Sequence, residues 1–287
     1  MRIHVNGVDL WFDVDGAKLS ADGAEMREKP TLVLLHGGPG ADHSIYKPCF
    51  DRLTELAQIV YVDLRGNGRS EDGDPENWVL AQWGDDVHAF CAALGIEKPI
   101  VLGASWGGVV AQAYATRHPD HPGALILAAT AARTEFEAIF AAFEALGGPH
   151  PAAVARAYWS DPSPERRAAY FETCLPLYSQ SQPDTDRLAR MIIKNPVAMA
   201  YNGQANEQGL FDFRADLAAL TCPVLVISAD QDPIMPSVFS DVIEAHLTAA
   251  PVTRRRLSPC GHAMAQDQPT AFFGAIESFI REVINHE

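Results

Sequence analysis

The sequence predicts an α/β protein with a mostly parallel sheet, helices on both faces of the sheet and one inserted helical segment. Apolar runs of four to seven residues alternate with helical segments as far as residue 129, which is typical of buried parallel strands. Between residues 133 and 214 this alternation stops, and an Ala-, Arg-, Glu- and Pro-rich stretch shows helical periodicity. We therefore expect a core built from residues 1–132 and 215–287, and a helical cap over 133–214.

The elements follow in order along the chain. Residues 2–14 predict a hairpin, because two alternating runs flank Asn6-Gly7, a strong signal for a tight turn. Residues 15–30 read as a polar loop. Further strands are expected over 31–36, 58–64, 99–102, 123–129, 223–228 and 252–257. Helices are expected over 44–56, 80–94, 108–115 and 269–285.

Composition limits the class of protein. The chain has 287 residues, of which 47% are hydrophobic, and no apolar run is long enough to span a membrane. The first residues lack an apolar signal region, so we expect a cytoplasmic protein with no membrane partner. A net charge of −15 disfavours nucleic acid as a partner. We expect a monomer or small homo-oligomer that binds a small molecule or a short peptide.

Cofactor and metal motifs are absent from the sequence. In Gly66-Asn-Gly68 and Gly38-Pro-Gly40 the third glycine of a dinucleotide-binding loop is replaced, by Glu71 and His43. The five cysteines are scattered without a C-x-x-C pair, and the ten histidines show no metal-ligand spacing. We therefore expect no cofactor, no metal and no disulfide framework.

Gly103-Ala-Ser-Trp-Gly107 is the most informative stretch. It follows an apolar run and precedes a helical segment, and this strand–turn–helix context exposes the serine hydroxyl at the end of a strand. A serine hydroxyl is a weak nucleophile at neutral pH, so it needs a neighbouring base and an acid that orients the base. The sequence predicts Ser105 as the nucleophile of an acyl transfer.

The acid and the base are expected late in the chain, in the order serine, acid, histidine. His262 follows the last predicted strand within a loop, so we predict it to be the general base. Asp230 and Asp232 both follow the strand over 223–228. We favour Asp232 as the acid because it lies further past the strand and precedes a proline, and we expect Asp230 to cap the turn.

Donors for the developing oxyanion are expected from two places. One is the backbone N–H of Trp106, directly after the nucleophile. The other is the loop His36-Gly-Gly-Pro-Gly40, in which we choose Gly38 first and Gly37 second, since Pro39 has no N–H. Asp63, Arg65 and Arg69 are expected to fix the neighbouring loop through ion pairs.

Three motifs together resemble the proline iminopeptidase (prolyl aminopeptidase) group of α/β-hydrolases: His-Gly-Gly-Pro-Gly at 36–40, Asp-Leu-Arg-Gly-Asn-Gly-Arg-Ser at 63–70 and Gly-Ala-Ser-Trp-Gly-Gly at 103–108. The resemblance implies the α/β-hydrolase fold, with a mostly parallel eight-stranded sheet and an inserted helical cap. It also implies the same Ser105, Asp232 and His262 triad, and removal of an N-terminal residue, often proline, from a small peptide or amide.

An aminopeptidase or amide hydrolase of this kind is the function we expect first, and the sequence leaves two alternatives open. Acidic cap residues bind the free α-amino group in those aminopeptidases, and Glu207 is our best candidate for such a contact here. An esterase or lactonase for small apolar substrates would share the triad but have a cavity without a buried carboxylate. A ligand receptor of the same fold, with slow turnover or none, is the third possibility.

Overall fold

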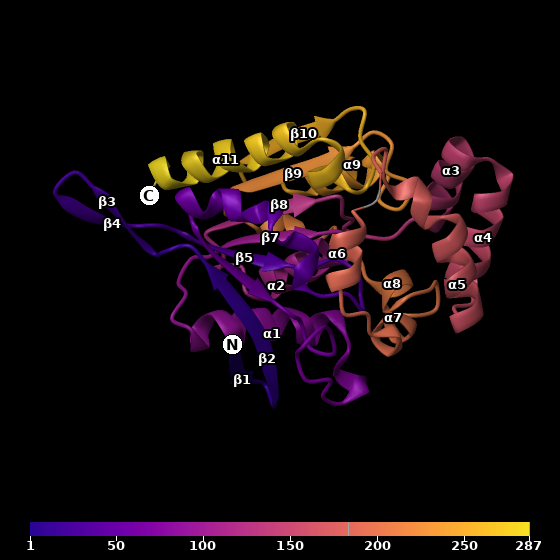
Figure 1. Ribbon diagram of the computed structural model, residues 1–287, viewed down its shortest axis with the longest axis horizontal. Helices are drawn as coiled ribbons and strands as arrows, with labels where there is room; N and C mark the ends of the chain where they lie inside the picture. Colours follow the sequence, from indigo (N-terminus) through magenta and orange to yellow (C-terminus); the bar gives the residue numbers. More distant parts are fainter. Residues whose placement is uncertain (183, 287) are drawn as a thin grey trace.

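The apolar runs form an eight-stranded sheet in the computed structural model, which describes residues 1–182 and 184–286 (Figure 1). The strand order is β1-β2-β6-β5-β7-β8-β9-β10. β1 and β2 form an antiparallel hairpin, β2 is antiparallel to β6, and all other pairs are parallel. The strands are Arg2–Val5, Val8–Asp15, Gln58–Val62, Thr31–Leu35, Ile100–Ala104, Ala124–Ala128, Val224–Ala229 and Val252–Leu257, in sheet order. The predicted fold class is confirmed.

Alternating side chains of the central strands supply two separate cores. In β5, Leu32 and Leu34 pack into the core on one face and Val33 and Leu35 into the core on the other, as the two-residue period of a strand requires. Figure 1 shows α11 (Pro269–His286) above the sheet and α1 (Leu80–Ala93) and α2 (Trp106–Arg117) below it. α9 (Ser237–His246), which the sequence reading missed, follows β9.

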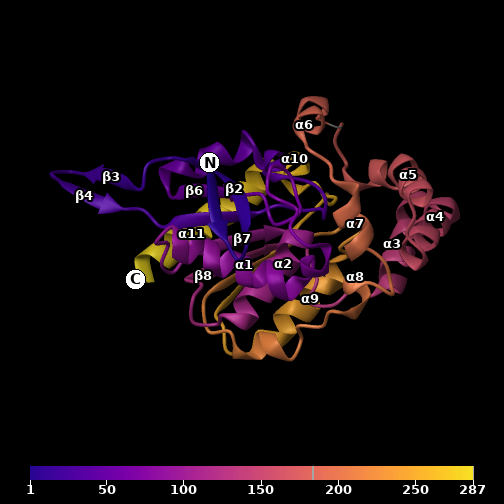
Figure 2. The ribbon, with the colours of Figure 1, turned by 90° about the horizontal axis from the view of Figure 1, so that it is seen from below.

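Helices fill the segment between β8 and β9. They are α3 (Phe136–Gly147), α4 (Pro149–Ser160), α5 (Pro164–Thr173), η4 (Leu175–Tyr178), α6 (Thr185–Arg190), α7 (Asn195–Tyr201), α8 (Glu207–Leu210) and η5 (Asp216–Ala219). Figures 1 and 2 both show α3–α8 at one end of the sheet. The two ends of this inserted segment meet: Arg133 and Asp212 form an antiparallel bridge.

Two predicted elements were wrong. Residues 15–30 contain a second hairpin, β3 (Leu19–Asp22) and β4 (Glu25–Glu28), rather than a loop. Every residue of β4 is exposed, so the hairpin has no apolar alternation to reveal it. The helix expected over 44–56 is two 3-10 segments, η1 (His43–Tyr46) and η2 (Cys49–Glu55). Pro48 separates them, because proline lacks an N–H and disfavours a helical residue before it.

The remaining elements are short: η3 (Pro75–Asn77) precedes α1, and α10 (Met264–Asp267) precedes α11. Within the described ranges, no helix combines the length and the apolar character that a membrane crossing requires.

Candidate active site

Ser105 lies in the turn between β7 and α2, with φ 57° and ψ −126°. Residues other than glycine seldom adopt a positive φ, and such backbone strain is typical of functional turns. The flanking glycines permit it: a Cβ at Gly103 would overlap the carbonyl oxygen of Gly107, and one at Gly107 would overlap that of Leu35. The G-x-S-x-G spacing thus follows from the close approach of β5, β7 and α2.

Asp232 and His262 meet at the carboxyl ends of β9 and β10. Oδ2 of Asp232 lies 2.7 Å from Nδ1 of His262. Oδ1 of Asp232 accepts hydrogen bonds from the backbone N–H groups of Ile234 and Met235, at 3.0 and 2.8 Å. Asp232 is only 3% exposed, so its carboxylate is held in one orientation. A carboxylate facing Nδ1 fixes the proton there and leaves Nε2 as the acceptor.

Two further carboxylates position the His262 loop. Asp230 accepts hydrogen bonds from Ser258 Oγ and from the backbone N–H of Cys260, at 2.5 and 3.0 Å. It therefore fastens the loop rather than contacting the histidine. Asp267 accepts the N–H of Gly261 at 2.8 Å and also Ser179 Oγ at 2.6 Å, so it joins the inserted segment to this loop. Burial raises the pKa of the Cys260 thiol to about 12, so this cysteine stays protonated.

The loop after β5 passes close to Ser105. Gly37 and Gly38 line the same cavity as Ser105 and Trp106, and Gly38 has φ +131°, which favours glycine. Nδ1 of His36 lies 2.8 Å from the carbonyl oxygen of Gly37, and its Nε2 accepts the N–H of Leu64 at 3.2 Å. Burial lowers the pKa of His36. Neutral His36 therefore orients the backbone of this loop, as the sequence suggested.

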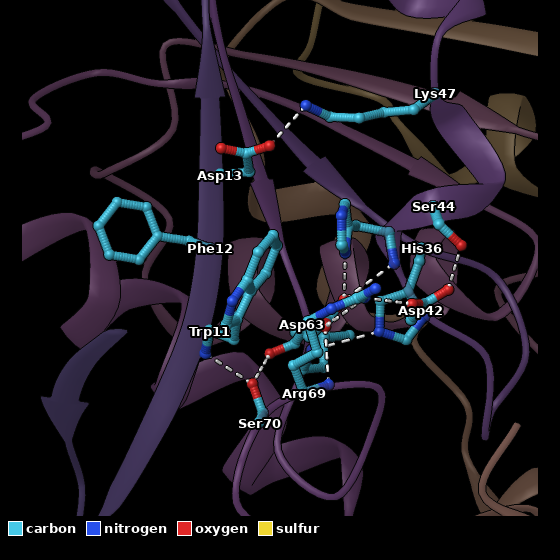
Figure 3. A network of polar contacts seen from close by, with 12 residues as sticks. Trp11, Phe12, Asp13, His36, Asp42, Ser44, Lys47, Asp63, Arg69 and Ser70 are labelled. Carbon is cyan, nitrogen blue, oxygen red and sulfur yellow. Dashed lines mark hydrogen bonds and ion pairs between the residues drawn. The ribbon is translucent and has the colours of Figure 1, made fainter. Parts of the chain in front are cut away.

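A polar network with buried carboxylates joins Asp42 and His43, which follow this loop, to Asp63 and Arg69 (Figure 3). The Asp63 carboxylate accepts hydrogen bonds from the backbone N–H and from Nδ1 of His43, at 2.9 and 2.8 Å. It also accepts a hydrogen bond from the backbone N–H of Arg69 at 2.8 Å. Arg69 also pairs with Asp42 at 2.7 Å. Asp42, His43 and Asp63 have donor atoms close enough to surround a metal ion, but the Arg69 cation already occupies one of their carboxylates. This cluster is an ion-pair network, which is the role expected for Asp63 and Arg69.

Arg65 has the same structural role. Its Nε and Nη2 atoms donate to the two carboxylate oxygens of Asp86 at 2.7 and 2.8 Å, and both side chains are buried.

A cavity of about 850 Å³ joins the serine, the histidine and the inserted segment. Its walls are mainly apolar and aromatic, including Phe50, Tyr158, Trp159, Tyr170, Phe171, Tyr178 and Met235. None of the described residues that line it is Asp or Glu. Two arginines do line it, Arg167 from α5 and Arg187 from α6.

The structure places Glu207 away from this cavity. Its Oε1 accepts the backbone N–H of Leu80 at 3.0 Å, at the start of α1. It lines a separate surface pocket with Leu80 and Asp85. In this structure the Glu207 carboxylate satisfies a helix N-terminus and does not line the cavity that contains Ser105, so a contact with substrate stays a prediction that the structure does not favour.

The sequence did not lead us to expect Arg167 in the cavity, because in Pro-Glu-Arg-Arg it resembles a residue on a solvated helix face. Its helical spacing to Tyr170 at i+3 and Cys174 at i+7, which are both buried, places it on the inward face of the helix.

Comparison with known proteins agrees with this geometry. Residues 30–268 match the family described as alpha/beta hydrolase fold. The chain belongs to this family. It is 30% identical over 253 residues to the proline iminopeptidase PfmaB of Pestalotiopsis fici, a match that covers 84% of this chain and 88% of that protein. A proline iminopeptidase of Lactobacillus helveticus is 40% identical over 114 residues, but that match spans only 37% of either protein.

Solved structures show the same fold. The crystal structure of proline iminopeptidase from Mycobacterium smegmatis superposes with a TM-score of 0.76 at 21% identity, covering 99% of this chain and 98% of that one. An esterase from Exiguobacterium antarcticum superposes with a TM-score of 0.70 at 18% identity, covering 96% and 97%. The protein is thus an enzyme of the α/β-hydrolase superfamily that resembles proline iminopeptidases.

Proposed function

We propose that the protein is a serine hydrolase that cleaves small, largely apolar esters or lactones through an acyl-enzyme on Ser105. The observation that carries this proposal is the composition of the cavity, which joins Ser105 and His262 to aromatic walls without an Asp or Glu in its described lining. The inserted segment serves as the cap, because its residues between Thr134 and Phe211 supply about half of that lining. Such a cavity suits an uncharged ester or lactone group next to the nucleophile.

The catalytic steps use this chain's own groups. Nε2 of His262 takes the proton from Ser105 Oγ as the oxygen attacks the substrate carbonyl, while Asp232 stabilises the imidazolium through Nδ1–H. The N–H groups of Trp106 and Gly38, with Gly37 as the alternative, hold the oxyanion. The imidazolium then protonates the leaving alcohol, and an ester to Ser105 Oγ remains. Water, deprotonated by His262, then attacks the carbonyl carbon of this ester. The bond to Ser105 Oγ breaks, the imidazolium returns its proton to Oγ, and the acid leaves.

Aminopeptidase activity is the second candidate, and the similarity to named proline iminopeptidases favours it. A free α-amino group is cationic near neutral pH and needs an acceptor when it is buried. The described cavity lining offers neutral acceptors such as Asn202 and Gln208 but no carboxylate, and it adds two cations. These charges would repel an ammonium group, so we rank this function below ester hydrolysis.

A substrate panel tests the proposal. Wild type and Ser105→Ala are compared on p-nitrophenyl butyrate, L-proline β-naphthylamide and the N-acetylated form of that amide. We expect wild type to cleave the ester, Ser105→Ala to lose at least about 10⁴-fold in kcat, and neither amide to react. Cleavage of the free-amine amide alone would establish an aminopeptidase and overturn the ester proposal.

A further inference from the structure

Arg167 is a buried cation without a counter-charge. It lies on α5, is only 9% exposed, and lines the same cavity as Ser105 and His262. Across residues 1–182 and 184–286, no carboxylate forms an ion pair with it, and its buried Nε has no hydrogen-bond partner.

The protein pairs its other deeply buried arginine fully. Arg65 is 2% exposed and forms a two-point ion pair with Asp86. An unpaired charge in an apolar cavity is strongly unfavourable, so such groups are normally paired. The contrast between Arg65 and Arg167 indicates that the counter-ion of Arg167 comes from outside the chain.

The neighbours of Arg167 leave its charge available. Its guanidinium stacks on the ring of Phe171, with 4.1 Å from Cζ to the ring centroid. Burial lowers the pKa of Arg167, and the interaction with the hydroxyl of Tyr158 opposes that shift. That hydroxyl already accepts a hydrogen bond from Asn202 at 2.8 Å. Because the guanidinium stays protonated even when buried, these uncharged groups hold the cation without neutralising it.

We propose that Arg167 binds a carboxylate of the substrate, so that the enzyme acts on esters or lactones that carry a carboxylate beyond a short apolar spacer. The inference rests on the proposed function. The planar fork of a guanidinium matches a carboxylate in two-point hydrogen bonding, so Arg167 accommodates one carboxylate group.

The guanidinium and the site of bond cleavage line one cavity. The ring of Tyr178 packs edge-on against His262, with centroids 5.3 Å apart, and its hydroxyl lies 2.6 Å from that of Tyr170, which is one turn from Arg167 on α5. Tyr178 and Tyr170 therefore connect the catalytic base to the helix that carries the guanidinium. One small molecule can place its carbonyl at Ser105 and its carboxylate at Arg167, with aromatic walls around the spacer.

Paired substrates test this directly. Monoethyl esters of the dicarboxylic acids from succinate to suberate are compared with their diethyl esters, which lack the charge. We expect at least one monoester to exceed its diester in kcat/KM by about 10-fold or more. Arg167→Met should lower kcat/KM for that monoester by about 10- to 100-fold and change the diester by less than about threefold. Arg167→Lys should restore part of the monoester rate.

Arg156→Met is the matched control. Arg156 also belongs to the inserted segment and stacks on a phenylalanine, Phe140, at 4.3 Å, but it is exposed and paired with Glu137. Arg156→Met should leave kcat/KM unchanged for both the monoesters and the diesters. If every diester is preferred, or if Arg167→Met and Arg167→Lys slow both esters equally, the carboxylate site is wrong.

A binding experiment separates this inference from the proposed function. Calorimetry with Ser105→Ala and the preferred monoester, or the whole monoester series if none is hydrolysed, needs no turnover. Binding that disappears in Ser105→Ala/Arg167→Met supports the carboxylate site even if wild type hydrolyses nothing, in which case the hydrolytic proposal alone fails. Hydrolysis of diesters without Arg167-dependent binding of any monoester would overturn the carboxylate site and leave the hydrolase intact.

Discussion

Asp232→Asn is the substitution that most sharply separates catalysis from folding. The carboxylate uses Oδ1 for the N–H groups of Ile234 and Met235 and Oδ2 for Nδ1 of His262. An asparagine would keep its carbonyl oxygen on the two N–H groups and turn its NH₂ group toward the histidine. The imidazole would then carry its proton on Nε2, where it cannot accept the Ser105 proton. By analogy with other Ser-His-Asp enzymes, kcat should fall about 10⁴-fold.

Asp230→Asn provides the matched comparison two residues away. Its carboxylate accepts from Cys260 N–H and Ser258 Oγ, and an asparagine can keep the first bond and donate to the second. We expect a loss of about 1 kcal/mol in unfolding free energy and a kcat within about 10-fold of wild type. The assay is kcat on p-nitrophenyl butyrate, with thermal unfolding to verify folding. If Asp232→Asn keeps a tenth of wild-type kcat, or if kcat of Asp230→Asn falls by about 10⁴-fold, the assignment of the acid is wrong.

Two other predictions concern residues beside the site. Glu207→Gln should lower Tm by a few degrees, for a loss of about 1 kcal/mol at the α1 N-terminus, without changing KM; a raised KM at constant Tm would return Glu207 to the substrate site. Burial lowers the pKa of His36, so the unfolded chain binds more protons than the folded chain below about pH 6.5. The free energy of unfolding therefore decreases as the pH is lowered through this range. In urea titrations at pH 8 and pH 5, His36→Gln should reduce that loss of stability by about 1 kcal/mol relative to wild type. An unchanged pH slope in His36→Gln would contradict the neutral role of His36.

The sequence was sufficient for features that follow from local geometry. Every residue of Thr31–Leu35 is buried, so the apolar run identifies a central strand without knowledge of its neighbours. The conformation of Ser105 depends on close backbone contacts at Gly103 and Gly107, and only glycine permits these contacts. Asp232 could be preferred over Asp230 because it lies further past the strand and precedes a proline, and the parallel pairing of β9 and β10 brings this turn to the same edge of the sheet as the His262 loop.

Features that depend on long-range contacts could not be predicted in the same way. Glu207 is 127 residues from Leu80, whose N–H it accepts, and no periodicity reports such a contact. No residue of β3 and β4 whose burial is described is buried, although Gly23 at the first position of the two-residue loop is a turn signal that could have indicated the hairpin. The charge balance of the cavity depends on which faces of α5 and α6 turn inward. Arg167 and the lack of acidic lining therefore emerged only from the structure.

Labelling of the nucleophile tests the central claim most directly. Wild-type protein is treated with a fluorophosphonate, which phosphonylates activated serines, and the modified peptide is identified by mass spectrometry. We expect one adduct per chain, on Ser105, absent in Ser105→Ala and formed far more slowly in His262→Ala. An adduct on another residue, or none in folded wild-type protein, would contradict the assignment of Ser105 as a nucleophile activated by His262.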